Sequence, residues 1–271
     1  MTEKFYFLQR IAYLCILKER LLWRDIMSSV MKFAIIAAGE GSRLAAEGVN
    51  SPKPLVEICG EALVDRLLRI FCRCGASEFV VICNPDRPEV ERHLRDIMRN
   101  GLNGVLTPMK LNVARTDSSM HSFFEISQHL TGEPFVLTTV DTIFWEEEFV
   151  AYVEAFRNAI AHGADAMMGV TSYVDDEKPL YVDVDNDGFI TGFYDDSCDC
   201  PHVSAGIYGL TPSCIETLVN CVANGESRMR NFQRALVREH KVLCAYSFGK
   251  VIDIDHASDI ADAEAFLKDD R

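Results

Sequence analysis

The sequence predicts an α/β fold in which helices flank a mainly parallel sheet that carries a small antiparallel insert. Short apolar runs alternate with segments whose apolar residues recur at helical spacing, which is the pattern of βαβ units. Residues 33–38 are apolar throughout, as a strand covered on both faces should be. From about residue 172 to 210 the chain changes to short strands separated by turn residues, and this stretch predicts the insert.

Composition narrows the classes of partner. The chain has 271 residues, 48% of them hydrophobic, which is enough for one well-buried core, and its formal net charge is −14. Because so acidic a surface repels nucleic acid and anionic lipid, we expect neither nucleic acid nor a membrane as a partner. A small phosphorylated substrate is still compatible, since a few cations and a metal ion outweigh the global charge at short range. The ten cysteines lack zinc or redox spacing, which indicates reduced thiols in a cytoplasmic protein.

The first thirty residues differ from the rest. Residues 5–26 are largely apolar, but charged side chains interrupt them too often for a membrane span, and no signal-peptide cleavage site follows. Met31 begins a segment that would be a natural start for an α/β domain. We therefore expect residues 1–30 to be an extension outside the main fold and residues 31–271 to form one domain. An interfacial or oligomerising helix at 1–30 is the alternative.

The first half of the chain alternates regularly between the two element types. Strands are predicted at 33–38, 79–83, 111–115 and 135–140, and helices at 61–74, 88–100, 118–130 and 146–161. The helix at 61–74 repeats apolar residues three and four apart, and Gly75 suits its left-handed cap. Ser118 or Ser119 suits the N-cap of the third helix. Three glutamates fill the first turn of the fourth, where the helix dipole favours negative charge.

The second half is predicted to contain the insert and the last strands. Strands are expected at 164–171, 180–184, 189–194, 203–210, 242–247 and 251–255, and helices at 212–222, 229–239 and 258–268. Asp185-Asn186-Asp187-Gly188 separates two apolar runs and has the residues that hairpin turns prefer. A calcium-binding loop that began at Asp183 would need glutamate at its twelfth position, where this chain has Tyr194. A plain turn is therefore the expected structure.

The most informative motif joins two segments that follow the first predicted strand. They are Ala37-Ala38-Gly39-Glu40-Gly41-Ser42-Arg43-Leu44 and Ser51-Pro52-Lys53-Pro54-Leu55-Val56. Glycines let backbone N–H groups approach a base or a phosphate without a Cβ in the way. Arg43 offers a fixed fork for phosphate oxygens, and Lys53 offers a point charge whose backbone is restrained by the flanking prolines.

Two better-known phosphate loops do not fit these residues. The dinucleotide fingerprint needs a third glycine, which is missing here, and we expect no helix to open directly at the loop. A Walker A loop needs Gly-Lys-Ser/Thr, which does not follow.

Together the two segments resemble the nucleotidyltransferase superfamily, which includes sugar-1-phosphate nucleotidyltransferases, MobA-like transferases and cytidylyltransferases for phosphocholine-type acceptors. The resemblance covers most of residues 31–270 and implies a Rossmann-like nucleotidyltransferase fold. It implies that the nucleotide is bound by Ala37, Ala38, Gly39, Gly41, Ser42, Arg43 and Lys53. It also implies catalytic roles for Arg43, Lys53 and Asp141.

The resemblance implies Mg²⁺ as the cofactor, with aspartates as its protein ligands. Asp141 follows the strand predicted at 135–140, where α/β sheets gather ligands, although a helix N-cap would also explain it. Asp253 and Asp255 resemble the family's terminal metal-binding segment, and alternation along an extended strand would place both on one side. Either is a candidate for the second ligand. Gly206-Ile207-Tyr208-Gly209 resembles the family strand that lines the acceptor pocket, which makes Gly206 a candidate acceptor-binding residue. An ordinary core strand is the alternative.

The implied reaction couples a nucleoside triphosphate to a small phosphorylated acceptor, either a sugar phosphate or a phosphocholine-like monoester, and releases pyrophosphate. Many sugar-phosphate members carry a Glu-Lys pair whose lysine grips the acceptor phosphate, whereas residues 194–200 here contain no lysine. This argues against a standard sugar-1-phosphate acceptor, unless Lys178 from the same insert substitutes.

Two other functions stay open. A glycosyltransferase of related architecture would hold a nucleotide-sugar through an Asp-x-Asp, which is spelled at 183–185 and at 253–255. The loop with Arg43 and Lys53 has no role in that class, which favours nucleotidyl transfer. A nucleotide-binding protein without turnover is the second alternative.

Overall fold

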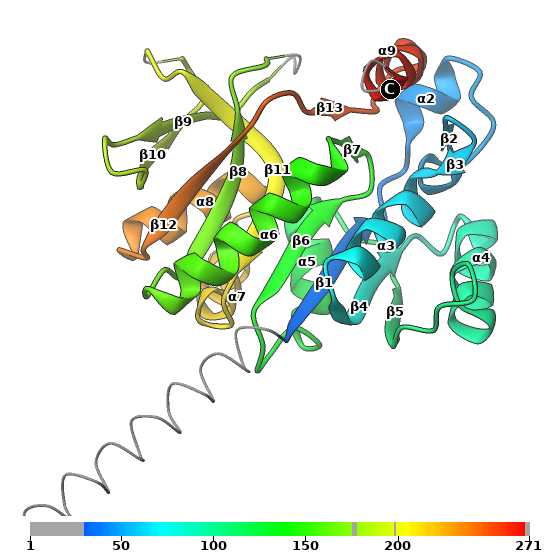
Figure 1. Cartoon of the computed structure of the whole chain (residues 1–271), viewed down its shortest axis with the longest axis horizontal. Coiled ribbons are helices and arrows are strands. Elements are labelled where there is room, and N and C mark those ends of the chain that lie inside the picture. The colour runs from blue at the N-terminus through cyan, green and yellow to red at the C-terminus, as the bar shows by residue number, and fades with distance from the viewer. Residues whose placement is uncertain (1–29, 175–177, 198, 269–271) are drawn as a thin grey trace, which may run out of the picture.

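The computed structural model describes residues 30–174, 178–197 and 199–268, so the predicted extension at 1–30 lies almost wholly outside the described residues. Nine strands form the central sheet: β1 (Met31–Ala37), β4 (Ala76–Cys83), β5 (Met109–Val113), β6 (Phe135–Thr139), β8 (Ala166–Thr171), β9 (Tyr181–Val184), β10 (Ile190–Tyr194), β11 (His202–Leu210) and β12 (Leu243–Phe248). Their order is β10-β9-β11-β6-β1-β4-β5, and β8 lies between β11 and β12 (Figure 1).

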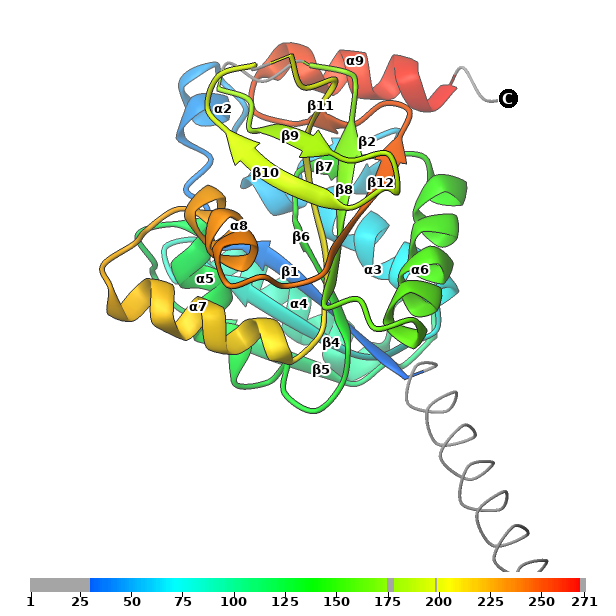
Figure 2. The same cartoon turned by 90° about the vertical axis from the view of Figure 1, so that its left-hand side faces the viewer.

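Helices cover both faces of this sheet, as the alternating sequence predicted (Figures 1 and 2). One face carries α3 (Leu63–Arg73), α4 (Pro88–Asn100) and α6 (Glu146–Ala161). The other carries α5 (Ser119–Ser127), α7 (Ser213–Ala223) and α8 (Met229–Arg238). Two further helices, α2 (Ser42–Ala46) and α9 (Ala257–Lys268), lie close together at one end of the sheet (Figure 1).

The first strand shows why the sequence folds into three layers. Phe33 and Ile35 belong to the apolar cluster under α3 and α6, whereas Ala34 and Ile36 belong to the cluster under α5 and α8. Side chains alternate along a strand, so a strand that is covered on both faces must be apolar at every position. The continuous apolar run at 33–38 is therefore explained by burial on two sides.

Parallel pairing brings the ends of the inner strands to one edge. β1 pairs in parallel with β4 and with β6, and β4 pairs in parallel with β5. Beyond this edge β7 (Thr142–Ile143) pairs with β13 (Ile252–Asp253), so that Asp253 lies opposite Thr142. This pairing carries the end of the chain back to the residues that follow β6. A second small pair joins β2 (Glu57–Ile58) to β3 (Glu61–Ala62).

The insert is antiparallel, as predicted, and it extends the main sheet. β9 and β10 form a hairpin, and β11 runs antiparallel to β6, β8 and β9. At the hairpin turn the Asp185 carboxylate accepts the N–H groups of Asp187 and Phe189, each at 2.9 Å. The turn is thus closed by its own aspartate, as a plain turn would be.

Two local predictions were wrong. A helix does open directly at the glycine-rich loop: α2 begins at Ser42, immediately after Gly41. Gly41 takes a left-handed conformation with φ 62°, which reorients the chain, and a helix of five residues is too short to show apolar periodicity. The strand expected at 251–255 is limited to Ile252–Asp253, because the Asp255 N–H bends back to the Asp253 carbonyl at 3.1 Å. The two aspartates therefore do not share one side of an extended strand.

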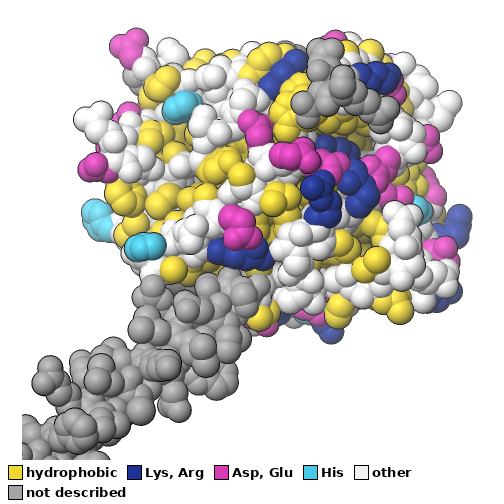
Figure 3. Space-filling view, in the orientation of Figure 1, with side chains coloured by type: hydrophobic (Ala, Val, Ile, Leu, Met, Phe, Trp, Pro, Cys, Tyr) yellow, Lys and Arg dark blue, Asp and Glu magenta, His cyan; other side chains and the backbone are white. Residues whose placement is uncertain are grey.

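The described surface mixes charges of both signs. Figure 3 shows basic and acidic side chains side by side on the face that α3 and α6 cover. On this face Arg69 binds Glu61 with two hydrogen bonds of 2.7 and 2.8 Å, and it also binds Glu146 of α6. In the described parts of the chain, no helix combines the length and the apolar character that crossing a membrane requires.

Candidate active site

A cleft of about 770 Å³ opens where β1 and β6 end. Its lining includes every nucleotide-binding residue that the sequence predicted, namely Ala37, Ala38, Gly39, Gly41, Ser42, Arg43 and Lys53. Asp141 and Asp255 line the same cleft. The position agrees with the rule that open α/β sheets bind ligands beyond the carboxyl ends of their strands.

Gly41 allows the loop to approach the lysine. Its φ of 62° lies in the left-handed region, which costs an L-residue roughly 1–2 kcal/mol. A Cβ at this position would also lie 3.2 Å from the Cβ of Lys53, which is tighter than ordinary contact. The missing side chain therefore serves both the turn and the packing of the next functional residue.

Lys53 is the central cation of the cleft. It begins a short 3₁₀ turn, Lys53–Leu55, that follows Pro52, and only 13% of its side chain is exposed. Its Nζ forms an ion pair with Asp141 and lies 2.7 Å from Asp255 Oδ1. Burial alone would lower the pKa of Lys53, but the two carboxylates outweigh burial and raise that pKa. The ammonium group is therefore charged at any physiological pH.

Arg43 reaches the same carboxylate from α2. Its Nη1 lies 2.8 Å from Asp255 Oδ2, so Asp255 binds one cation with each oxygen. Burial by itself would raise the pKa of Asp255, but Lys53 and then Arg43 lower it. Asp255 is thus an ionised carboxylate that is shared between two cations.

Asp253 has different neighbours. It does not line the main cleft; it opens onto an adjacent small cavity of about 120 Å³, to which Ser204 and Tyr173 also contribute. The Ile254 N–H binds the Asp141 carbonyl at 3.1 Å, which holds this segment beside Asp141. The Asp253 side chain reaches solvent, but partial desolvation by the surrounding protein and then the negative charge of Asp141 raise its pKa. Two carboxylates that repel each other across this edge form an environment that favours a cation.

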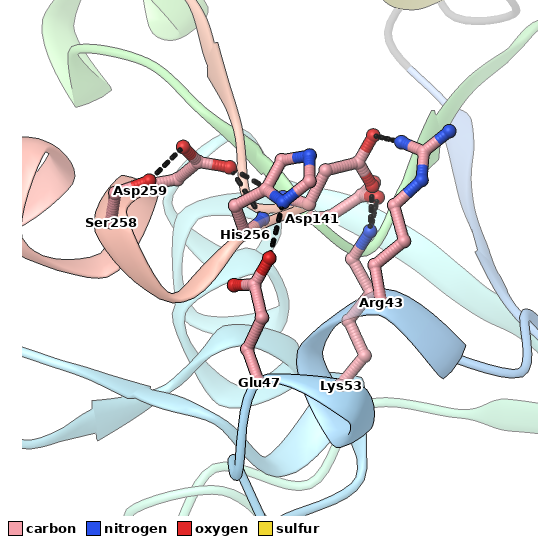
Figure 4. A network of polar contacts seen from close by, with 8 residues as sticks. Arg43, Glu47, Lys53, Asp141, His256, Ser258 and Asp259 are labelled. Carbon is pink, nitrogen blue, oxygen red and sulfur yellow. Dashed lines mark hydrogen bonds and ion pairs between the residues drawn. The ribbon is translucent and has the colours of Figure 1, made fainter.

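A chain of polar contacts surrounds these groups (Figure 4). Glu47 Oε1 lies 2.7 Å from His256 Nδ1, and Glu47 Oε2 accepts the Ala257 N–H at 2.6 Å. Asp259 Oδ2 accepts the N–H groups of Asp255 at 2.8 Å and of His256 at 2.6 Å. The Ala257 N–H and then His256 lower the pKa of Glu47, and the hydrogen bond to Glu47 raises the pKa of His256.

The far side of the cleft is formed by the loop before α5. Ser118 caps this helix, since its Oγ accepts the His121 N–H at 3.4 Å, and both Ser118 and Thr116 line the cleft. Asn84 lines it as well and donates to the Ala38 carbonyl at 3.2 Å, which holds the end of β1. The turn that was predicted to cap this helix thus also faces the cleft.

Gly206 lies in the predicted strand, and its role at the acceptor stays a prediction. It lies in β11 with φ 70°, and a Cβ there would come within 3.4 Å of Thr142 Oγ1. It is not among the residues that line the small cavity, to which Ser204 and Ala205 of the same strand do contribute. The side chains of these two residues, together with Glu47 and Asp259, were missed by the sequence reasoning.

A third cavity, of about 710 Å³, lies beside the insert and is lined mostly by charged groups. It is lined by Lys178, Pro179, Tyr181, Asp195, Asp196, Ser197, Arg228, Arg230, Asn231 and Arg234. Arg230 and Arg234 both form ion pairs with Asp195. Four cations against two carboxylates leave this lining with a net charge of about +2 in a chain whose formal net charge is −14. Pro179 lines both this cavity and the small one beside Asp253.

The described residues contain no group of three or more histidine, cysteine, aspartate or glutamate side chains that could hold a metal ion alone. Mg²⁺, however, commonly binds one or two carboxylates and takes its other ligands from substrate phosphates and water. Asp141 and Asp253 fit this requirement, because they lie on adjoining segments and the charge of one raises the pKa of the other.

The fold defines the class: a Rossmann-like α/β protein with its main cleft beyond the strand ends. A family model described as the MobA-like NTP transferase domain matches residues 33–240, more than half of the chain, and the chain belongs to this family. UTP–glucose-1-phosphate uridylyltransferase AglF of Haloferax volcanii is 25% identical over 248 residues, which cover 89% of this chain and 98% of that protein.

Two other relatives match over shorter stretches. N-acetylmuramate alpha-1-phosphate uridylyltransferase of Caulobacter vibrioides is 31% identical over 137 residues, 49% of this chain and 54% of that protein. Glucose-1-phosphate cytidylyltransferase of Salmonella typhimurium is 25% identical over 112 residues, which are 41% of this chain and only 39% of the relative's length.

Solved structures share the fold at low sequence identity. The inositol-1-phosphate CTP transferase of T. maritima has a TM-score of 0.72 and 16% identity, and the match covers 89% of this chain and 97% of that one. UDP-glucose pyrophosphorylase complexed with UDP-glucose has a TM-score of 0.72 and 17% identity, with 89% and 100% covered. These likenesses establish the Rossmann-like nucleotidyltransferase fold that the sequence predicted.

Proposed function

We propose that this protein is a magnesium-dependent nucleotidyltransferase that transfers a nucleoside monophosphate from a nucleoside triphosphate to a small phosphorylated acceptor. The observation that carries the proposal is the convergence of Arg43 and Lys53 with Asp141 in one cleft. Membership of the family, and relatives that are named nucleotidyltransferases, support the reaction class.

The proposed reaction is a single in-line displacement. A phosphate oxygen of the acceptor attacks the α-phosphorus of the nucleotide, a new P–O bond forms, the bond to the β-phosphate breaks, and pyrophosphate leaves. A phosphate monoester has its second pKa near 6, so the attacking group is already mostly ionised at pH 7 and needs no general base. Catalysis then depends on positioning and on charge stabilisation.

The cations of the cleft are suited to that stabilisation. Lys53 and Arg43 both form ion pairs with carboxylates. When a triphosphate enters, its oxygens replace part of these partners, so the buried Lys53 is never left without a counter-charge. Both cations then face the phosphate groups on which negative charge develops.

Asp141 and Asp253 are the residues that would hold Mg²⁺. The ion would neutralise phosphate charge and polarise the bond that breaks. Asp255 is assigned a different role, since each of its oxygens already binds a cation. Its carboxylate keeps Arg43 and Lys53 in place until the nucleotide arrives.

We place the acceptor in the cavities beside Asp253. The stretch at 194–200 contains no lysine, but Arg228, Arg230 and Arg234 line the adjoining cavity and supply positive charge for an anionic acceptor. Arg228 is exposed at the N-cap of α8. The arginine fork suits phosphate and carboxylate oxygens, which fits an acceptor that carries a phosphate group.

The glycosyltransferase alternative loses one of its two candidate motifs. Asp183 binds Thr191 Oγ1 at 2.6 Å, and Asp185 closes the hairpin turn, so both belong to the insert. Neither lines the main cleft. A nucleotide-sugar would therefore have to use Asp253 and Asp255 alone.

The test is magnesium-dependent release of pyrophosphate. Each nucleoside triphosphate is combined with sugar 1-phosphates, phosphocholine and similar monoesters. We expect release that requires one acceptor and that falls about 10²–10³-fold in Asp141→Asn, as removal of a charge-stabilising group usually does. Arg228→Ala should raise the KM for the acceptor and leave nucleotide binding unchanged.

Three results would contradict the proposal. Release by Asp141→Asn at the wild-type rate would remove this residue from the mechanism. Nucleotide binding without release for any acceptor in the panel would favour the non-catalytic nucleotide binder. Release of nucleoside diphosphate from a nucleotide-sugar would favour the glycosyltransferase.

A further inference from the structure

The segment from Asp253 to Asp259, here called the aspartate turn, is held by two carboxylates, one from within the segment and one from α2. Asp259 fixes it from within, because its Oδ2 accepts the N–H groups of Asp255 and His256. An acidic side chain at the third position of a helix, here α9, commonly reaches back in this way to the N–H of the residue before the helix. It shapes the turn but does not connect it to the nucleotide loop.

Glu47 makes that connection. It is the C-cap residue of α2, more than 200 positions away in sequence, and both of its oxygens are used. One lies 2.7 Å from His256 Nδ1, and the other accepts the N–H of Ala257, the first residue of α9. Figure 4 shows Glu47 reaching from α2 toward the aspartate turn.

Arg43 and Glu47 lie four positions apart, which places them as neighbours on one side of the helix. Both touch the aspartate turn, Arg43 through Asp255 and Glu47 through His256 and Ala257. The two contacts differ in what happens when a nucleotide enters. A phosphate group would compete with Asp255 for Arg43, whereas Glu47 uses groups that phosphate does not need. After nucleotide binding, Glu47 is the contact that still joins α2 to the turn.

We infer that Glu47 is a positioning residue that holds Asp253 in register with the nucleotide loop, so that both can engage one magnesium–nucleotide complex. This inference rests on the proposed function. Glu47 touches neither the phosphates nor the metal; it acts through the aspartate turn. Its loss should therefore weaken the magnesium-dependent part of nucleotide binding and leave the metal-independent part unchanged.

The experiment measures nucleotide binding by calorimetry, with Mg²⁺ and with EDTA, and needs no acceptor. In Glu47→Ala we expect binding with Mg²⁺ to weaken roughly tenfold, the lower end of the effect of residues that orient metal ligands. Binding in EDTA should match the wild type within about twofold, since such a residue acts only through the metal side. The Mg²⁺ concentration for half-maximal binding should rise in parallel.

Two further variants separate positioning from charge and from folding. Glu47→Gln can still accept the Ala257 N–H and should recover most of the binding. Glu57→Ala removes the same charge from an exposed position on β2 and should behave as the wild type. Thermal unfolding of each variant shows whether it is folded under the conditions of the measurement.

Each outcome decides the question. Equal magnesium-dependent binding by folded Glu47→Ala and wild type overturns the inference, as does equal weakening with Mg²⁺ and with EDTA. If Glu47→Gln is as weak as Glu47→Ala, charge rather than positioning is responsible. If the wild type binds no nucleotide under any condition, the proposed function fails, and the inference fails with it.

Discussion

At the scale of single residues, the main feature of the site is that Lys53 and Arg43 share the carboxylate of Asp255. Lys53 is largely buried, and a buried ammonium without a partner would be unfavourable by several kcal/mol. Asp141 and Asp255 supply the partners, and they raise the pKa of Lys53 although burial opposes this. Lys53, Arg43, Asp141 and Asp255 therefore balance one another's charge, and under the proposed function a triphosphate would compete with Asp255 for both cations.

This competition separates the roles of the two terminal aspartates. Asp253→Asn should lower turnover about 10²–10³-fold and raise the Mg²⁺ requirement, because a proposed metal ligand is lost. Asp255→Asn removes a carboxylate that competes with phosphate, so it should lower the nucleotide KM or leave it unchanged, with the same Mg²⁺ requirement. Titration of activity with Mg²⁺ measures the Mg²⁺ requirement of each variant, and titration with nucleotide measures its KM. A larger increase in the Mg²⁺ requirement for Asp255→Asn than for Asp253→Asn would reverse the assignment.

The residues that the sequence identified are those that a local motif contains. Arg43 and Lys53 belong to one compact pattern, and Asp141 follows a strong strand, so their convergence follows from the fold class. Glu47 and Asp259 were missed because a glutamate after a short helix and an aspartate in a first helical turn are ordinary surface residues. Only the return of the chain through β13 gives Glu47 its partners.

At the scale of elements, the length of a helix or strand decided how well its bounds could be predicted from the sequence. α6 has the predicted bounds, Glu146–Ala161, because sixteen residues carry clear apolar spacing and acidic residues fill the first turn. α2 has five residues and no such pattern, so its start depended on the conformation of Gly41. The strand at 251–255 was predicted too long, since apolar and polar residues also alternate through the turn that ends it.

The loop that precedes α2 gives the prediction at this scale. Gly41→Ala should destabilise the fold by roughly 1–2 kcal/mol from its left-handed backbone, and the new Cβ should also displace Lys53. Nucleotide KM should therefore rise. Gly163→Ala is the control, since Gly163 has φ 94° but nothing within 4 Å of an added Cβ.

Urea unfolding and nucleotide kinetics measure the two effects separately. Both variants should lose similar stability, and only Gly41→Ala should alter nucleotide KM. If Gly41→Ala binds nucleotide like the wild type, the close approach of the loop to Lys53 is not required for the site.

At the scale of the whole molecule, a chain of net charge −14 collects its substrate through local fields. Charges beyond about 10 Å are largely screened at ordinary ionic strength, so the nearby cations decide what binds. Two groups of cations, around Lys53 and around Arg228, line the main cleft and the cavity beside the insert, and the small cavity beside Asp253 shares lining residues with both. The arrangement suits two anionic substrates that meet between them.

Away from the cleft, one ion pair gives the stability of the molecule a dependence on pH. His93 of α4 lies 2.7 Å from Asp65 of α3, and this hydrogen bond raises the pKa of His93. A raised pKa in the folded state means that the stabilisation is complete below the unfolded value of about 6.5 and is lost as pH rises through the folded value. Because both side chains are partly exposed, we expect about 0.5–1 kcal/mol.

Urea unfolding of wild type and His93→Gln at several pH values measures this contribution. Glutamine retains a hydrogen-bond donor, so the comparison reports mainly the charge. The difference in unfolding free energy should be largest at pH 5.5–6 and should vanish once the pH exceeds the raised pKa. His162→Gln is the control, because the His162 ring contacts the Asn158 carbonyl rather than a carboxylate. A difference for His93→Gln that stays constant across the range would show that packing, and not the ion pair with Asp65, joins α4 to α3.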